Sequence, residues 1–366
     1  MDKLDIGLEV VKILKQNKYQ AYVVGGAVRD FLLKRPISDI DITTSAMPKE
    51  IAELFEIEKM EESYLSCKVI WKTISFEITT FRKDVCYQDH RHPVTIKTES
   101  LEEDLIRRDF TINALAMDDT YQIIDRFGGQ EDLKQKKIRT IGKTSKRFEE
   151  DALRVLRAIE LASRLDFSLD EEIITSFSVD YVKHLSEEYI YPMIKKISSH
   201  PSLTGLRLIH TYKVLKSFPF YQVLVDEAVE YGYNKNIFAL FYTLHNFLPR
   251  NIKISKEEVI HAKEIAELVR NGFDFKSLYY GNLKLIPEAV ELYNIVYKKS
   301  ILEEQVMQDY GKLPIKRYQD IHFDFMGIRP CQRSFWIHKI EREILDGRLS
   351  NTQEDILKFI EKRFSK

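Results

Sequence analysis

The chain has 366 residues, enough for two or three domains with cores of their own. Its 56 basic and 57 acidic side chains give a net charge of −1, which excludes a uniformly basic nucleic-acid binder but not a locally basic one. Cys67, Cys86 and Cys331 lack paired spacing, which argues against a disulfide framework or a zinc site and is typical of free thiols in the cytoplasm. We also expect no membrane contact, because no apolar stretch is long enough for a span and the N-terminus lacks a signal-peptide pattern.

Short β-prone runs alternate with helical segments in the first 140 residues, which predicts a mixed α/β domain. The expected helices cover residues 8–15 and 49–55. The expected strands cover residues 21–24, 40–43, 68–71, 76–80 and 122–124. After about residue 143 the β-prone runs fade and apolar residues recur at helical spacing, so we expect the rest to be helical.

The first candidate site follows the expected strand 21–24. Val24 leads into Gly25 and Gly26, and a helix carrying Arg29 is expected to begin there. Glycines let a ligand approach the backbone closely, and a helix N-terminus offers free N–H groups to phosphate. Arg29 adds a guanidinium suited to phosphate. The turn is therefore a candidate phosphate-binding loop, with a plain turn as the alternative.

The second candidate site is the Asp39-Ile40-Asp41-Ile42 segment. On a strand, residues i and i+2 face the same side, so Asp39 and Asp41 converge while Ile40 and Ile42 enter the core. Two carboxylates this close need a cation, and Mg²⁺ prefers such hard oxygen ligands. The alternative is a solvated strand face. Glu77, on a later expected strand, is either a third carboxylate or a surface residue.

These motifs carry a family resemblance. Residues 25–30 and 39–41 resemble the head domain of class II tRNA nucleotidyltransferases and bacterial poly(A) polymerases. Residues 107–114 (RRDFTINA) look like the second motif of that family, and residues 125–129 (DRFGG) like the third, a flexible junction between head and neck. The resemblance implies an α+β head with a polymerase-β-like nucleotidyltransferase fold, followed by an all-α neck, body and tail.

The resemblance also implies roles for single residues. In the second motif, Arg108 and Asp109 are expected to hold the ribose, and their side chains are able to bond phosphate and the 2′-hydroxyl. Gly26, Arg29 and Arg157 are expected to hold phosphates. Asp39 and Asp41 are expected to be the catalytic residues and the ligands of Mg²⁺.

A fourth motif, residues 149–157 (EEDALRVLR), offers a way to read a base. Asp151 and Arg154 are three residues apart, so on one helix they lie side by side. The carboxylate accepts from an exocyclic amino group and the guanidinium donates to a ring nitrogen, which suits cytosine and adenine but not uracil or guanine. The alternative is an ordinary helical salt bridge. Many relatives carry a further Arg where this chain has Glu160, so one contact is either missing or supplied elsewhere.

Two further segments bear on the assignment. Residues 82–93 are polar with both charges, resemble the flexible loop of full CCA-adding enzymes, and favour a chain that also adds the terminal A. His90 and His92 within this segment are read as solvated loop residues rather than metal ligands. In the fifth motif of the family, residues 185–189, Tyr189 stands where Arg is usual.

We expect a catalytic head (1–140), a base-recognising neck (141–205), a body (206–280) and a tRNA-binding tail (281–366). Two windows of the sequence are locally basic. The first, residues 134–164, has ten Lys/Arg against four Asp/Glu. The other, 312–366, has twelve against eight. They are predicted to form a phosphate-binding stripe on one face.

Three functions are weighed. The first is a cytoplasmic enzyme that completes the 3′-CCA end of tRNA from CTP and ATP by a two-metal mechanism, without an obligate protein partner. The second is an enzyme that adds only the terminal A, or a poly(A) polymerase. The third is a non-catalytic RNA-binding protein on the same scaffold, against which the intact Gly pair and the Asp39/Asp41 carboxylates argue.

Overall fold

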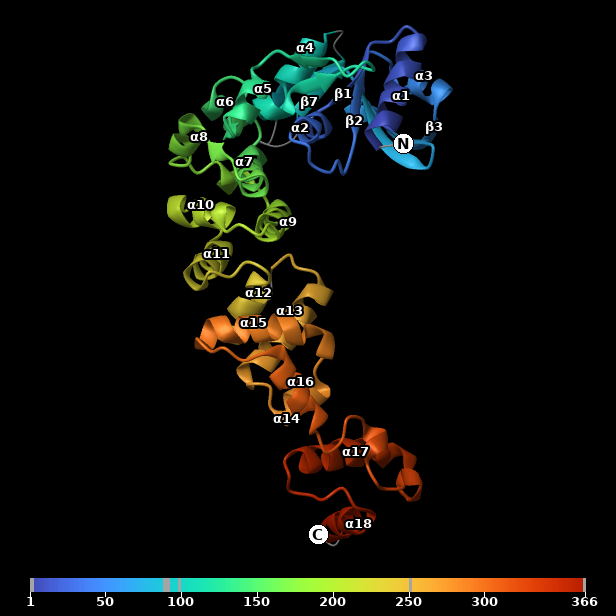
Figure 1. Cartoon of the computed structure of the whole chain (residues 1–366), viewed down its shortest axis with the longest axis vertical. Helices are drawn as coiled ribbons and strands as arrows, with labels where there is room; N and C mark the ends of the chain where they lie inside the picture. The colour runs from blue at the N-terminus through green and yellow to red at the C-terminus, as the bar shows by residue number, and fades with distance from the viewer. Residues whose placement is uncertain (1–2, 88–92, 98–99, 250–251, 365–366) are drawn as a thin grey trace. The chain divides into compact units, whose positions relative to one another are not determined.

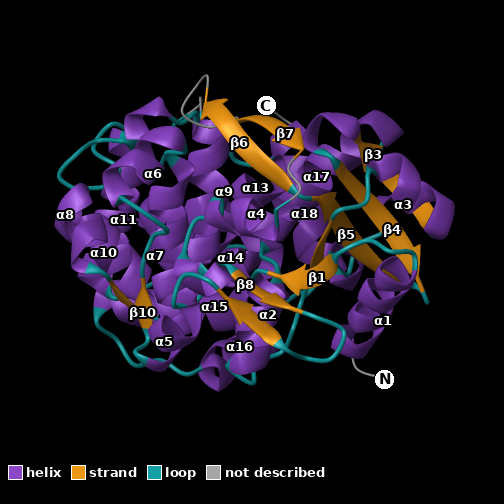
Figure 2. Cartoon of the chain, turned by 90° about the horizontal axis from the view of Figure 1, so that it is seen from above, coloured by secondary structure: helices purple, strands orange, loops and turns teal. Residues whose placement is uncertain are grey.

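The computed structural model describes residues 3–87, 93–97, 100–249 and 252–364. The chain divides into two compact units, residues 1–222 and 223–366. Apart from one pair of two-residue strands, the strands of the described residues precede the long helical part in chain order (Figure 1). Figure 2 shows the strands in orange and the helices in purple. The predicted fold class, an α+β head followed by helices, is confirmed, whereas the finer division into head, neck, body and tail stays a prediction.

A mixed seven-stranded sheet organises the first unit, in the order β3-β4-β5-β2-β1-β8-β9. The central pair β2 and β5 is parallel, and the other neighbours are antiparallel. The strands are β1 (Ala21–Val24), β2 (Asp41–Thr44), β3 (Glu56–Glu61), β4 (Ser66–Trp71), β5 (Ile74–Thr80), β8 (Leu115–Met117) and β9 (Ile123–Asp125).

One face of this sheet is covered by helices. Helix α1 (Lys3–Gln16) packs on β1 and β2, and α3 (Pro48–Leu54) packs on β3 and β4 (Figure 1). Strand side chains alternate between faces, and on the covered face Ile42, Val69 and Ile78 are fully buried. The residues between them face the other way, where the polar side chains gather.

Most of the expected elements of the head are found. Residues 8–15 and 49–54 are helical, and the runs 21–24, 68–71, 76–80 and 123–124 lie within strands. Strand β8 was missed because its three residues are all buried, so it has no polar alternation to reveal it. Strand β3 was missed because it is mostly charged.

The other elements of the first unit connect the sheet to a helical region. A separate two-stranded antiparallel sheet, β6 (Arg82–Tyr87) and β7 (Pro93–Lys97), follows β5. Strands β10 (Lys137–Ile138) and β11 (Ser168–Leu169) pair in parallel. The helices are α2 (Gly26–Leu32), α4 (Leu101–Ile106), α5 (Gly129–Lys134), α6 (Thr144–Glu150), α7 (Leu153–Leu165), α8 (Glu171–Ser176), α9 (Glu187–Ser198) and α10 (Thr204–Tyr212), and α11 (Pro219–Tyr231) crosses the division at residue 222.

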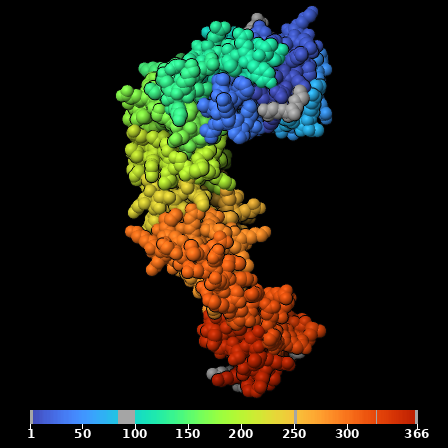
Figure 3. All heavy atoms as spheres, viewed as in Figure 1, coloured from blue at the N-terminus to red at the C-terminus, as the bar shows by residue number. Residues whose placement is uncertain are grey.

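Helix α7 is central to the helical region, because it packs against both α9 and α10. In the space-filling view, the blue and cyan residues of the sheet region adjoin the green residues of these helices within the same unit (Figure 3).

The second unit is helical throughout its described residues. Its centre is α13, which packs against α12 and α15 and buries Ala262, Ile265 and Val269 between them. The helices are α12 (Ile237–His245), α13 (Lys256–Arg270), α14 (Phe275–Tyr280), α15 (Ile286–Tyr297), α16 (Glu303–Gly311), α17 (Pro330–Leu345) and α18 (Gln353–Phe364). Across the described parts of both units, no helix has the length and apolar character that a membrane crossing requires.

Candidate active site

The turn between β1 and α2 is built on a glycine in the left-handed region. Gly25 has a φ of 74°, a conformation that side-chain-bearing residues rarely adopt. A Cβ at this position would lie 3.0 Å from the Arg108 Nη1 atom and 3.7 Å from an Asp41 oxygen. Gly26 then begins α2. The predicted order of strand, glycine pair and helix is confirmed, and the glycine leaves room for charged side chains to approach the backbone.

Asp39 and Asp41 lie at the start of β2. The strand begins at Asp41 rather than at Ile40, so Asp39 belongs to the segment leading into it. Ile40 and Ile42 are buried as expected. Burial raises the pKa of the Asp41 carboxyl, which Arg108 partly opposes and the negative charge of Asp39 reinforces. Negative charge on Asp41 is thus disfavoured until a cation is present.

Glu77 is a direct neighbour of this site. In the parallel β2–β5 pair, Asp41 stands opposite Glu77, so both side chains lie on the same face of the sheet. Burial raises the pKa of the Glu77 carboxyl, and the charge of Asp41 adds to that rise. Among the described residues, no group of three or more acidic, His or Cys side chains is arranged to hold a metal ion by itself.

A buried acid organises the arginines beside the carboxylates. Asp104, which is 0% exposed, accepts hydrogen bonds from the Arg107 Nη2 at 3.0 Å, the Thr43 Oγ1 at 3.2 Å and the Arg82 backbone N–H at 3.3 Å. Its other ion-pair partner is Arg108, at 3.6 Å. Burial alone would raise the pKa of this carboxyl, but Arg107 and Arg108 hold it below its usual range. Asp104 therefore stays charged and fixes both arginines.

A chain of polar contacts links α2 to α7. Arg29, 2% exposed, donates to both oxygens of Asp30 at 2.9 Å and to the Asn113 Oδ1 at 2.6 Å. The Asn113 amide donates to Asp109 at 3.0 Å, and Asp109 pairs with Arg157 at 2.6 Å. Burial opposes ionisation of Asp109, yet Arg157 and Asn113 keep its pKa below the usual range. Arg29 is therefore already committed to protein partners, whereas Arg157 is half exposed.

The expectation that Asp151 and Arg154 share one helix is wrong. Helix α6 ends at Glu150 and α7 begins at Leu153, with Asp151 extended between them. The Asp151 carboxylate accepts the Leu153 backbone N–H at 3.1 Å, which satisfies a donor at the start of α7. Arg154 donates to Glu150 at 3.0 Å and to the Arg107 carbonyl at 3.2 Å. Both residues nevertheless line the same pocket, because the chain turns at Asp151.

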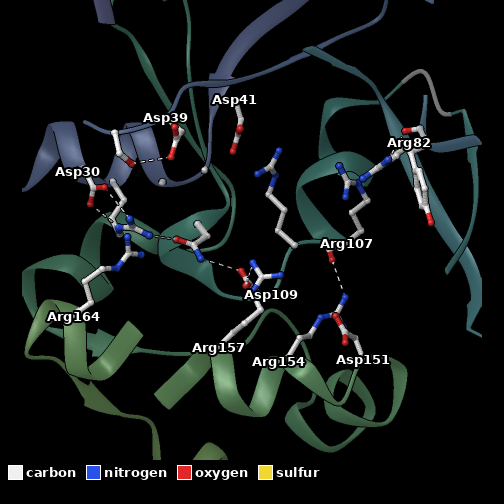
Figure 4. Close-up of a pocket in the computed structure, with 17 residues that line it drawn as sticks. Asp30, Asp39, Asp41, Arg82, Arg107, Asp109, Asp151, Arg154, Arg157 and Arg164 are labelled. Atoms are coloured by element: carbon white, nitrogen blue, oxygen red, sulfur yellow. Dashed lines mark hydrogen bonds and ion pairs between the residues drawn. The ribbon is translucent and has the colours of Figure 1, made fainter. Parts of the chain in front are cut away.

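All of these residues converge on a pocket of about 600 Å³. Asp39 and Asp41 lie on one side of it, and Asp151, Arg154 and Arg157 project from the other (Figure 4). Every site residue predicted from the sequence is in its lining: Gly26, Arg29, Asp39, Asp41, Arg108, Asp109, Asp151, Arg154 and Arg157.

Further lining residues were not predicted as site residues. They are Gly25, Asp30, Ser38, Tyr64, Arg82, Arg107, Asn113 and Arg164. Arg107 and Asn113 lie within the second motif, and Asp30 within the first, so the motifs themselves carried a signal for them. Arg82 begins the polar segment 82–93, which was singled out only as a loop, and Tyr64 comes from a 3₁₀ turn that carried no signal.

Glu160 does not face the pocket. It is buried and contacts His200 at 3.2 Å, Arg164 at 3.4 Å and Lys196 at 3.6 Å. The pocket wall instead receives Arg164, one helical turn later. The positive charge expected near position 160 is therefore present, but it comes from a different residue.

The segment expected to act as a lid is a strand pair at its described ends. Residues 82–87 and 93–97 form β6 and β7, and the closing role of the segment stays a prediction. His90 and His92 lie outside the described residues. Of the three cysteines, Cys67 is buried and Cys331 exposed, both as free thiols.

Comparison with known proteins gives consistent matches. Residues 21–139 match the model of the Poly A polymerase head domain family. The CCA-adding enzyme of Bacillus cytotoxicus is 33% identical, with 96% of each chain covered. That of Bacillus subtilis is 32% identical, with 97% of this chain and 98% of the relative covered. The crystal structure of the Bacillus stearothermophilus CCA-adding enzyme in complex with CTP is 27% identical, with a TM-score of 0.84 over 100% of this chain and 98% of that one.

Proposed function

The chain belongs to the family of CCA-adding enzymes, and from this premise we propose that it adds C, C and A to the 3′ end of tRNA, using CTP and ATP and releasing pyrophosphate. One observation carries the proposal: the carboxylates Asp39 and Asp41 line the same pocket as Asp151 and Arg154, and further arginines line it too. A matching relative was crystallised with CTP. The free thiols of Cys67 and Cys331 are in keeping with a cytoplasmic location, which is part of the proposal.

Nucleotidyltransferases of this kind generally use a divalent metal, and the residues present fit Mg²⁺. Asp39 and Asp41 offer hard carboxylate oxygens, and Glu77 stands next to Asp41 on the sheet. Mg²⁺ commonly takes one or two protein carboxylates and completes its shell with substrate phosphate and water. When bound, a pair of Mg²⁺ ions lowers the pKa of the RNA 3′-hydroxyl and neutralises the triphosphate.

The arginines and the second motif position the nucleotide. Arg157 is half exposed in the pocket and exchanges its contact with Asp109 for a phosphate oxygen. Asp109 then becomes available to the ribose hydroxyls, and Arg108 stays fixed by Asp104. Arg29 adds positive charge from a buried position rather than an open guanidinium. The 3′-oxygen of the RNA attacks the α-phosphorus, and pyrophosphate leaves.

Asp151 and Arg154 select the base without a template. The Asp151 carboxylate accepts the exocyclic amino group of cytosine or adenine, while Arg154 donates to the neighbouring ring nitrogen. Uracil and guanine present the opposite order, which places a carbonyl oxygen against the Asp151 carboxylate and a ring N–H against the Arg154 guanidinium and so disfavours both bases. Exchanging the two residues, with Asp151→Arg and Arg154→Asp, should weaken the preference for CTP and ATP over UTP and GTP. An unchanged preference would remove the base-reading role.

Addition to trimmed tRNA tests the function directly. The purified chain is incubated with tRNA lacking its last three nucleotides and with labelled CTP alone, ATP alone, or both. We expect two C residues with CTP alone and a completed end with both nucleotides. Addition of A only, and only to tRNA ending in CC, would indicate the A-adding alternative, and long A tails a poly(A) polymerase. Binding without any addition would indicate the non-catalytic alternative.

The carboxylates provide the matched control for that assay. Asp39→Ala and Asp41→Ala are expected to abolish addition while tRNA binding is retained, because these carboxylates hold the metal and are not among the basic residues expected to bind the RNA backbone. Near-normal turnover in either variant would contradict the metal assignment.

A further inference from the structure

A second groove begins at the same carboxylates and runs away from the nucleotide pocket. It has a volume of about 1000 Å³ and shares Asp39 and Asp41 with that pocket. Its floor is the uncovered face of β5, β4 and β3, where Glu77, Lys68 and Lys59 are exposed side chains. The described arrangement therefore gives the carboxylates two open approaches, of which the triphosphate and base-reading residues occupy only one.

The strand register turns this face into an ordered row. Asp41 stands opposite Glu77, Glu77 opposite Lys68, and Lys68 opposite Lys59. Directly paired residues project from the same face, and neighbouring strands lie about 4.8 Å apart. The backbone position of Lys68 is therefore about 10 Å from that of Asp41, and that of Lys59 about 14 Å. The row runs from two acids at the reaction centre to two lysines at the outer end, where Glu61 also lines the groove.

Both lysines are accessible to a ligand. The side chains of Lys68 and Lys59 are 51% and 66% exposed, and each pairs with a glutamate of β3, Glu58 and Glu61. Exposed ion pairs of this kind contribute little, so a phosphate can replace the carboxylate at low cost. The hydroxyls of Ser66 and Ser75 lie in the same groove and offer hydrogen bonds.

The polarity of the row matches one end of a nucleic-acid strand. Phosphates are attracted to the lysine end and repelled by Asp41 and Glu77, whereas a terminal hydroxyl carries no charge and tolerates the acidic end. In nucleotidyl transfer, the attacking hydroxyl and the leaving pyrophosphate lie on opposite sides of the reacting phosphorus. Two substrates must then approach the carboxylates from two directions, as the two cavities allow.

Resting on the function proposed above, we infer that this groove binds the 3′-terminal segment of the RNA strand that is being extended. Lys68 and Lys59 contact its last phosphates, and its terminal hydroxyl lies at Asp39 and Asp41. The groove is thus a second substrate subsite, which meets the nucleotide pocket at Asp39 and Asp41.

The test removes the lysine charges from the protein and the phosphate charges from the end of the tRNA, separately and together. Full-length wild type, Lys59→Ala/Lys68→Ala and the control Lys12→Ala, an exposed lysine of α1 on the covered side of the sheet, are compared in addition of A to tRNA ending in CC. A second tRNA carries uncharged methylphosphonate linkages at its last two phosphates. For the wild type, we expect the modified tRNA to raise the tRNA KM by about tenfold, as loss of charge-assisted contacts predicts.

For the double variant, we expect a similar rise in KM with ordinary tRNA and little further change with the modified tRNA, because the interaction is already lost. The KM for ATP should stay within about twofold, since the nucleotide pocket is intact, and Lys59→Arg/Lys68→Arg should restore the tRNA KM. The inference is overturned by a double variant whose tRNA KM equals that of Lys12→Ala. It is also overturned if the tRNA KM of the double variant rises by about a further tenfold with the modified tRNA. A wild type that adds nothing to any tRNA overturns the proposed function instead.

Discussion

At the scale of single residues, Asp41 shows a conflict between activity and stability. Its carboxyl lies beside Asp39 and Glu77 in a partly desolvated site, and burial raises its pKa. A carboxyl whose pKa is higher in the folded protein than in the unfolded chain destabilises the fold once it is ionised. The negative charge of Asp41 therefore lowers the stability of the metal-free fold, and the rest of the structure offsets this loss.

Asp41→Asn should consequently abolish nucleotide addition and raise the melting temperature of the metal-free protein. Thermal unfolding in the presence of a chelator measures the second effect. Glu53→Gln, an exposed carboxylate on α3, is the control and should change neither property. A lower melting temperature for Asp41→Asn would show that this charge stabilises the fold.

The same raised pKa predicts how activity depends on pH. As pH falls, Asp41 and Glu77 take up protons at a higher pH than ordinary carboxyls do, so the acid limb of the rate profile should lie above the usual carboxyl range. Metal binding competes with these protons, so raising the Mg²⁺ concentration should move the acid limb to lower pH. The measurement is kcat/KM for CTP against pH at two Mg²⁺ concentrations, and an acid limb that does not move contradicts the ligand assignment.

The sequence predicted individual site residues well where they lie in short motifs. Asp39 and Asp41 were identified because an alternating strand orients them, and their burial pattern agrees. Tyr64 and Arg82 were missed because tertiary folding, not local spacing, brings them to the pocket. The departure at Glu160 was visible, but its compensation by Arg164 depends on how α7 faces the pocket and α9, which no local pattern encodes.

At the scale of elements, the break between α6 and α7 is the main departure from expectation. The sequence analysis places Asp151 and Arg154 on one helix, yet Asp151 is extended and separates α6 from α7. The apolar residues on both sides keep helical spacing, so the break leaves no mark in hydrophobic periodicity. It changes how Asp151 and Arg154 reach the pocket without removing either from it.

Helix α5 illustrates how tightly an element can depend on one glycine. A Cβ on Gly129 would lie 2.4 Å from the Thr111 carbonyl oxygen, a backbone atom that cannot move aside cheaply. Gly129→Ala should therefore lower stability by about 2 kcal/mol through overpacking, measured by urea unfolding. It should also lower the rate of addition, because Thr111 begins the turn that carries Asn113.

Gly311→Ala is the matched control, since no atom lies within 4 Å of the added Cβ and the position has no positive φ. It should be neutral or slightly stabilising. Equal effects of the two substitutions would mean that α5 does not pack on the 111–113 turn as described.

At the scale of the whole molecule, the two locally basic windows lie in different units. The basic windows 134–164 and 312–366 belong to the first and second units, respectively. That the two windows share one face stays a prediction, and so does the prediction that both bind tRNA. The two-unit division itself was not evident from composition, because helical periodicity continues through residue 222 without interruption.

Salt dependence of tRNA binding measures the contribution of each window. Each phosphate contact contributes about 0.7 to 0.9 to the slope of log affinity against log salt. Lys143→Ala/Lys146→Ala in the first window and Lys362→Ala/Arg363→Ala in the second should each reduce the slope by about one to two. Lys12→Ala should leave it unchanged. A window whose variant keeps the wild-type slope does not contact the RNA backbone.

The contacts of Asp104 have a consequence for how such a chain can diverge. One buried carboxylate is shared by Thr43 of β2, the backbone at Arg82, and both Arg107 and Arg108. Replacing Asp104 alone would remove the shared anionic partner of two partly buried arginines, so we expect single substitutions at this position to be selected against. Among descendants of a common ancestor, we therefore expect changes at 104, 107 and 108 to appear together or not at all. The history of these three positions would then be that of one inherited unit.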